Sequence, residues 1–275
     1  MTKIPFFACT FFLVGGALLS GCSGGSSSSG GGTQLGSTVT VAAGTGRTFV
    51  QNNFDGSPSV VGLTFSESAL TSLESEATAA AKRTVRHAGH PDTSEEEHGN
   101  VFSFDLPSNN KTVLNHVTLD WNPAGHPPAN VYGIPHFDVH FYMITPAEKA
   151  LVSPVDADVP APAAAEIAPD YVSGVEGVPQ MGVHYIDTQS EEWQPTPHIF
   201  AKTMIYGYYK GNMTFIEPMV SADYLKTKPT FSTAMKVPAK VKKAGYYPTR
   251  YSIEYDASSK NYNVTLSNFV KRNAG

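Results

Sequence analysis

Short segments in which apolar and polar residues alternate recur along this 275-residue chain, and they constrain its fold more than any other feature. Near the C-terminus, Tyr251, Ile253 and Tyr255 alternate with polar neighbours, and residues 261–267 repeat the pattern after a turn at 257–260. A period of two residues is that of a β-strand with one face against a core. The two segments therefore predict an antiparallel hairpin.

Comparable segments, separated by turn signals such as the DGSP at 55–58, predict further strands. The expected strands lie at 38–41, 47–52, 59–65, 101–106, 115–121, 134–144, 181–187, 202–209, 212–220, 250–255 and 261–267. A helix is expected at 66–85, where Leu70 and Leu73 begin an apolar stripe of helical spacing. We predict an all-β fold, in the form of a single barrel-like or sandwich domain with one helix.

One long segment interrupts this pattern. Residues 145–180 are rich in Pro and Ala, a composition that argues against regular sheet. We expect an ordered loop or lid there, which makes a long Pro/Ala loop part of the predicted architecture.

The first 22 residues predict export. Lys3 supplies a positive start, and residues 4–18 form an apolar run that is too short for a comfortable membrane span. The run ends in LSGC at 19–22, the pattern of a bacterial lipobox, whose cysteine accepts diacylglycerol. We therefore predict a signal peptide at 1–21 and lipidation of Cys22.

The segment after Cys22 has the composition of a flexible tether, SGGSSSSGGG. The expected organisation is a signal peptide at 1–21, the lipidated cysteine and its tether at 22–37, and a single β-rich domain at 38–275. Such a chain would be exported and lipid-anchored to the cell membrane. Ser23 after the lipidated cysteine favours the outer membrane, facing the periplasm, in a cell with two membranes.

Cysteine usage and charge limit the chemistry of the domain. Cys9 and Cys22 are the two cysteines of the chain, so the predicted domain contains no thiol for a disulfide or a thiolate metal site. The formal net charge is -5, and a nucleic-acid partner does not suit an exported chain. The partners that we expect are the membrane, through Cys22, and a small-molecule ligand, and a homo-oligomer is left open.

The most informative stretch for function is HVTLDWNPAGHPPANVYGIPHFDVHFY at 116–142. In a strand, alternate residues share a face, so His136, Asp138 and His140 point the same way. Imidazole and carboxylate groups on one face are typical of a polar pocket. The alternative is that this face meets water while the apolar face forms the core.

Three other segments offer candidate residues. His126 lies in a stiff GHPP turn just before the strand, and His184 lies on the expected strand 181–187, where a core histidine is an equal alternative. Glu217 shares an expected strand face with apolar residues, Met213 among them. Because burial of an unpaired charge is costly, Glu217 needs a metal, a histidine or the basic C-terminal region as its partner. That region, from Lys202 onward, carries 12 basic and 4 acidic residues.

Strand spacing limits how these residues can share an ion. His136 and His140 lie roughly 13 Å apart on one strand, so they cannot ligate the same ion. A mononuclear site would combine His136 or His140, with or without Asp138, with His126, His184 or Glu217. This set of N and O donors suits Zn, Fe, Mn or Cu.

The sequence leaves three functions open. The leading one is a pocket that binds a divalent metal or a small polar ligand. The second is a metal-dependent enzyme with His140 or Glu217 as general base, although HEXXH, P-loop and nucleophile-elbow motifs are missing from the sequence. The third is a structural envelope lipoprotein without a ligand site.

Four motifs resemble a bacterial family of exported proteins. They are LDWNPxGHxP at 119–128, PHFDxHFY at 135–142, MGVH at 181–184 and MTFxEPM at 213–219, of which HFDxHFY is the most specific. The domain of that family has no assigned biochemistry, and one member is known as an anti-sigma-factor-controlled protein. The resemblance covers roughly 47–220 and implies a compact β-rich domain, export and expression linked to envelope stress, without implying an activity.

Overall fold

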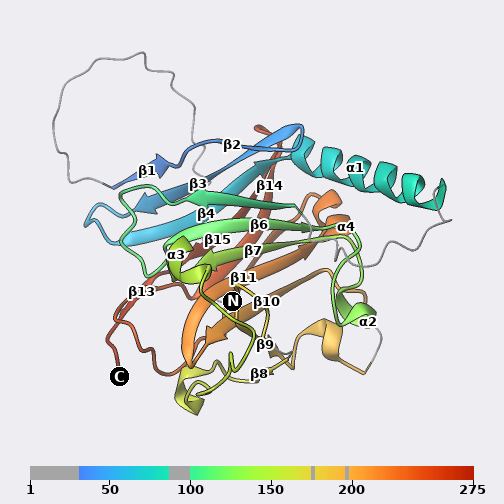
Figure 1. Cartoon of the computed structure of the whole chain (residues 1–275). Coiled ribbons are helices and arrows are strands. Elements are labelled where there is room, and N and C mark those ends of the chain that lie inside the picture. Colours follow the sequence, from blue (N-terminus) through green and yellow to red (C-terminus); the bar gives the residue numbers. More distant parts are fainter. Residues whose placement is uncertain (1–30, 87–99, 175–176, 196–197) are drawn as a thin grey trace, which may run out of the picture.

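The computed structural model describes residues 31–86, 100–174, 177–195 and 198–275. The predicted signal peptide, Cys22 and most of the predicted tether lie outside the described residues. The chain forms two large antiparallel sheets and a two-stranded ribbon (Figure 1).

The strands divide among the three sheets as follows. The first sheet contains β1 (Gly32–Leu35), β2 (Val39–Val41), β3 (Gly44–Asn52), β4 (Pro58–Ser66), β12 (Thr230–Ala234), β14 (Arg250–Asp256) and β15 (Asn261–Ser267). The second sheet contains β5 (Val101–Asp105), β6 (His116–Asn122), β7 (His136–Tyr142), β8 (Tyr171–Ser173), β9 (Val183–Asp187), β10 (Lys202–Tyr209) and β11 (Asn212–Ser221). The ribbon pairs β13 (Gly245–Tyr247) with β16 (Val270–Arg272).

The two large sheets pack face to face as a sandwich. The strand order is β1-β3-β4-β15-β14-β12 in the first sheet, with β2 on β3, and β5-β6-β7-β11-β10-β9-β8 in the second. Alternate side chains such as Ile253 and Val264 from the first sheet and Leu119 and Phe141 from the second are fully buried in the shared core. Of the two predicted forms, the described chain therefore takes the sandwich, in which neither sheet closes into a barrel.

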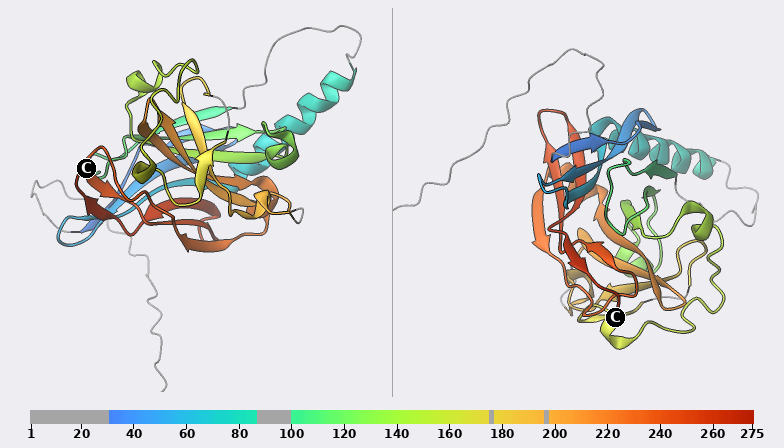
Figure 2. Two further views of the ribbon diagram at one scale, coloured as in Figure 1. Left: turned by 90° about the horizontal axis from the view of Figure 1, so that it is seen from below. Right: turned by 90° about the vertical axis from the view of Figure 1, so that its left-hand side faces the viewer.

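The predicted helix is confirmed as α1 (Glu67–Arg86). The Ser66 side chain accepts a hydrogen bond from the Ala69 amide at 3.3 Å, which caps one of the free N–H groups of the first turn. Ala69, Leu70 and Leu73 are buried against the sandwich, as the helical spacing predicts. Beyond these first turns α1 runs outward from the body of the domain (Figure 2).

The hairpins predicted at 202–220 and 250–267 are confirmed as β10/β11 and β14/β15. The first turns through Lys210 and Gly211, whose φ angles are 47° and 73°, a combination that suits a two-residue hairpin loop. Strand β1, by contrast, falls within the segment that composition assigns to the tether. It pairs with β3, so the sheet already begins at Gly32.

The Pro/Ala loop is ordered where it is described, but the prediction that it contains no sheet is wrong. It includes α3 (Pro146–Lys149), the 3₁₀ turn η1 (Ala164–Glu166) and β8, which pairs with β9. Strand β8 is only three residues long and is formed by its pairing with β9, so the composition of the segment does not indicate a strand. Short helices α2 (Ala129–Tyr132) and α4 (Ala222–Lys226) and the turn η2 (Glu191–Trp193) complete the described chain. None of the described helices has the length and apolar character of a membrane span.

Candidate metal centre

The polar face of β7 points into the protein. His136, Asp138 and His140 are 0%, 5% and 0% exposed. The opposite face of the strand, with Phe137 and Val139, belongs to the core between the two sheets. The polar face therefore lies on the outer side of the second sheet and is nevertheless shielded from water, which excludes the alternative of a solvated strand face.

A second, smaller core covers this outer face. Phe215 and Met219 of β11 pack there with Tyr132 of α2 and with Phe200, all of them buried. The Tyr132 and Phe200 rings meet edge to face with their centroids 5.1 Å apart, and the Phe200 ring lies 5.5 Å from that of His136. Side chains from β11, from α2 and from the segment before β10 thus enclose the polar groups of the sheet.

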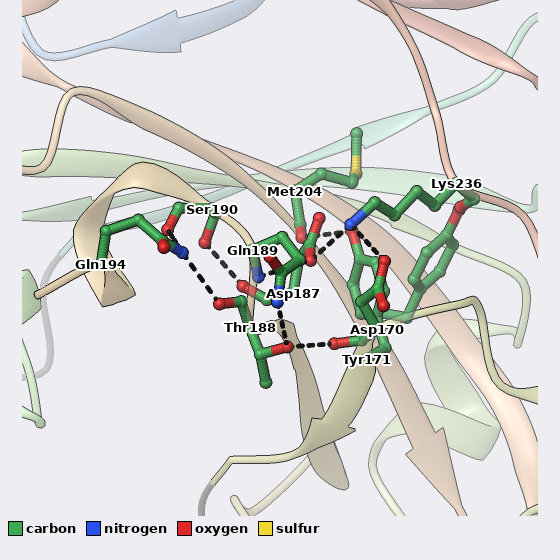
Figure 3. Close-up of polar contacts among 10 residues, drawn as sticks. Asp170, Tyr171, Asp187, Thr188, Gln189, Ser190, Gln194, Met204 and Lys236 are labelled. Carbon is green, nitrogen blue, oxygen red and sulfur yellow. Dashed lines mark hydrogen bonds and ion pairs between the residues drawn. The ribbon is translucent and has the colours of Figure 1, made fainter.

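A polar network fixes the turn that leads from β9 to the cover (Figure 3). The Lys236 Nζ lies 2.8 Å from Asp187 Oδ1 and 2.9 Å from Asp170 Oδ2. Gln194 donates to the carbonyl groups of Thr188 and Ser190 at 3.1 and 3.3 Å. These contacts hold the segment that carries η2 (Glu191–Trp193). The side chain of Trp193 packs on the second core.

The register of the second sheet brings polar groups from four strands to this face. Across β6 and β7, Thr118 pairs with His140 and Asp120 pairs with Asp138. The register of β7 with β11 sets His140 beside Glu217. On the other side of β11, β10 pairs with β9, and this pairing brings His184 of β9 toward the Glu217 carboxylate.

The six predicted residues divide into two clusters. The first, the His126 cluster, consists of His126, His136 and Asp138. His126 Nε2 lies 3.4 Å from Asp138 Oδ2, and His136 Nε2 lies 3.2 Å from Asp138 Oδ1. One potential ligand atom from each residue lies within 4.8 Å of the other two, which is close enough for all three to hold one ion.

Backbone carbonyl groups orient both histidines of the His126 cluster. His136 Nδ1 donates to the Ile134 carbonyl at 2.7 Å, and His126 Nδ1 donates to the Pro127 carbonyl at 2.9 Å. A carbonyl oxygen only accepts, so Nδ1 of each ring carries a proton, and Nε2 is the nitrogen that faces Asp138 and can bind a metal once it is deprotonated. Such outer hydrogen bonds are typical of metal-ligating histidines.

The second cluster, the His140 cluster, consists of His140, His184 and Glu217, with potential ligand atoms again within 4.8 Å. His140 Nε2 lies 3.5 Å from Glu217 Oε1, and His184 Nε2 lies 3.8 Å from Glu217 Oε2. The other ring nitrogen of His140, Nδ1, lies 3.2 Å from Asp120 Oδ2. Glu217 therefore has histidine partners, whereas the basic C-terminal region supplies none among its described contacts.

Burial and charge perturb the pKa values in both clusters. Burial lowers the pKa of a histidine, but Asp138 outweighs this effect at His126, and Glu217 and Asp120 outweigh it at His140, so that both pKa values rise to about 9. Burial raises the pKa of Glu217 to about 8, against the opposing pull of His140. Burial, together with repulsion from His140, lowers the pKa of His184 to about 3.

Most of the buried side-chain polar atoms without a hydrogen-bond partner in the described chain lie at this face. Most buried side-chain polar atoms in folded proteins have a hydrogen-bond partner. Here several do not, namely Thr118 Oγ1, Asp120 Oδ1, His136 Nε2, Asp138 Oδ1, Tyr142 Oη, His184 Nδ1, Glu217 Oε2 and both ring nitrogens of His140. These are the atoms that a bound cation or polar ligand would satisfy.

The division into two clusters follows the strand spacing, which places His136 and His140 too far apart to share an ion. One detail of the strand prediction is wrong. A bulge opposite Gly207 and Tyr208 adds a residue to β11, so Met213 turns to the sandwich core while Phe215 stays on the second core. Glu217 consequently keeps fewer apolar neighbours on its face than strict alternation predicts.

The candidate set predicted from the sequence lacked two supporting residues. Asp120 lies beside His140, and Asn122 donates to Asp138 Oδ2 at 2.7 Å. The shared face of Asp120 with His116 and Thr118 was a usable signal. For Asn122 there was none, because its contact depends on the pairing of β6 with β7.

No family model, curated protein or solved structure matches this chain. The family resemblance carried by the HFDxHFY block therefore stays a prediction.

Proposed function

We propose that the protein binds a divalent metal ion at the His126 cluster. The observation that carries this proposal is the orientation of its histidines. His126 and His136 each donate Nδ1–H to a backbone carbonyl and direct Nε2 toward a carboxylate, Asp138, which is itself held by Asn122. Imidazole groups that are held through Nδ1 and present Nε2 beside an oriented carboxylate are the features of a protein metal site.

The donor set indicates the kind of ion. Two imidazole nitrogens and one carboxylate oxygen, without thiolate, suit Zn, Fe, Mn or Cu. Structural zinc sites usually have four protein ligands, whereas three leave a position for water or a small polar ligand. The His126 side chain is 34% exposed, so this cluster lies next to solvent.

A second candidate function, metal-dependent catalysis, is favoured by the same three-ligand set and by its neighbour Glu217. A divalent ion bound there would act as a Lewis acid. Glu217, whose pKa burial raises to about 8, has the proton affinity of a general base near neutral pH, and His140 lies beside it to exchange the proton. We place binding first because the described residues contain no substrate-specific feature.

The N-terminal sequence supports a location. We propose that the protein is exported and anchored by a lipid at Cys22, with the following Gly/Ser segment as a tether to the membrane. Intact-mass analysis of wild type and Cys22→Ser tests this: loss of the lipid mass and release from the membrane fraction are expected for the variant. An unlipidated wild-type chain would contradict the anchor.

Metal analysis tests the binding function. The full chain, expressed without a histidine tag and purified in detergent, is equilibrated with Zn²⁺, Mn²⁺, Cu²⁺ or, without oxygen, Fe²⁺, and then assayed for bound metal. We expect binding of at least one of these ions and its loss from the His126 cluster in His126→Ala and His136→Ala.

The matched control is His198→Ala, because His198 is an exposed histidine outside both clusters. It should bind as much metal as wild type. A wild-type chain that binds none of the four ions, and gains no thermal stability from them, would contradict the proposal and favour a structural lipoprotein.

A further inference from the structure

We propose that the His140 cluster is a second metal position, so that each chain binds two divalent ions. This inference extends the proposed function and depends on it. It concerns a different set of ligands, His140, His184 and Glu217, which come from β7, β9 and β11 and share no residue with the His126 cluster.

The surroundings of His140 are those of a ligand. Its Nδ1 lies 3.2 Å from Asp120 Oδ2, and its Nε2 faces Glu217 Oε1 at 3.5 Å. A carboxylate behind the imidazole, with the second ring nitrogen directed at a common point, is the arrangement that supports metal-bound histidines. His184 Nε2 approaches the same carboxylate from β9, on the far side of β10, at 3.8 Å.

One ion cannot serve both clusters. Asp138 and His140 are neighbours on the same face of β7, a separation of roughly 6.5 to 7 Å along a strand. Ligand bonds of the relevant metals are roughly 2 Å long. In each cluster, the potential ligand atoms of its own three residues already lie within 4.8 Å of one another. The geometry therefore points to two metal positions side by side along β7.

The buried charge also calls for more than one cation. Asp120 lies directly across from Asp138 in the register of β6 and β7, and Glu217 lies beside them on β11. Among the described residues, histidines are the only ion-pair partners of these three carboxylates. An ion at the His126 cluster would compensate Asp138 and leave Asp120 and Glu217 on either side of His140, whose single positive charge balances only one of these two carboxylates. Buried charges of one sign without compensation are strongly unfavourable.

The two positions differ in their access to solvent. The side chains of His140 and Glu217 are 1% and 2% exposed, against 34% for His126. Phe215 packs edge to face on the His140 ring at 4.7 Å and also contacts His184. We therefore expect the ion in the His140 cluster to leave more slowly.

The experiment counts ions per chain. The full chain without a histidine tag, in detergent, is saturated with the metal that it binds best, Zn²⁺ for instance, and analysed by native mass spectrometry and elemental analysis. We expect two ions in wild type and in the His198→Ala control, and one ion in His126→Ala and in Glu217→Gln. A chelator should remove the two wild-type ions in two phases, and Glu217→Gln should retain only the faster phase.

The outcomes separate this inference from the proposed function. One ion in wild type that is lost in His126→Ala and kept in Glu217→Gln overturns the second position and leaves the first intact. Two ions that both persist in Glu217→Gln also overturn it. Absence of any ion removes both proposals. Circular dichroism checks folding, and His184→Gln replaces Glu217→Gln if that variant does not fold.

Discussion

Gly207 offers a sharp test of how the His140 cluster is built. This residue lies on β10 directly across from Phe215, whose ring covers it. A methyl group at this position would lie 2.1 Å from Phe215 Cε1, 2.3 Å from Cζ and 2.4 Å from Cδ1. Because carbon atoms in contact need about 3.5 Å or more, Gly207→Ala forces the ring to move by more than about 1 Å.

The ring has little room to move. Phe215 is fully buried, and its centroid lies 4.7 Å from that of His140, 5.2 Å from that of His184 and 5.4 Å from that of Tyr142. Overpacking of this kind costs roughly 1 to 3 kcal/mol of unfolding free energy. At roughly 2 to 4 °C per kcal/mol for a domain of this size, the melting temperature should fall by about 2 to 12 °C. The displaced ring would also disturb both histidines of the His140 cluster.

Urea unfolding and metal stoichiometry measure the two effects. We expect Gly207→Ala to lose stability by the amount above and to bind one ion fewer than wild type. Gly32→Ala is the control, because an added methyl group there meets no atom within 4 Å, and it should stay within about 0.5 kcal/mol of wild type. Phe215→Leu should reduce the cost of Gly207→Ala in a double-mutant cycle. A Gly207→Ala protein of wild-type stability with both ions bound would refute this reasoning.

Three further predictions concern metal, pH and the cover. Metal at a hundredfold excess over its dissociation constant should add about 2.7 kcal/mol per independent site to the unfolding free energy, and Asp138→Ala should abolish the contribution of the His126 cluster. Burial and the charge of Lys149 lower the pKa of His116 in the folded protein from 6.5 to about 4. As the pH falls from 6.5 to about 4, His116 therefore takes up a proton in the unfolded chain but not in the folded one. The unfolding free energy should fall over that pH range by at most about 3 kcal/mol, and in the presence of chelator it should fall less for His116→Gln. An equal fall in the variant would contradict the assignment of this effect to His116. Lys236→Met should lower the unfolding free energy by about 1 kcal/mol or less, because the lysine is part-exposed. It should nevertheless accelerate amide exchange in the turn 188–194. Unchanged exchange there would show that the network of Figure 3 does not hold the turn.

The sequence predicts those parts of the fold that depend on local pattern. The stripe of Leu70 and Leu73 gives α1, and the alternation around Ile253 and Val264 gives a hairpin, because each pattern reflects the side-chain period of one element. Strand β8 escaped prediction because it is formed by pairing with β9 and carries too few residues for a period. The prediction of the face to which Met213 points was wrong for a related reason. The bulge that turns this residue depends on the pairing of β10 with β11 and not on β11 alone.

For the site, the sequence by itself determined that His136, Asp138 and His140 share one face and that the two histidines cannot share an ion, because strand geometry fixes both facts. Only the tertiary structure decided that this face is buried, because the cover forms only when Tyr132 of α2 packs against Phe200, which lies far from β7 in the sequence. It also decided which carboxylate meets which histidine. Those contacts depend on the register between strands, which is set by long-range pairing and not by the local composition of any one strand.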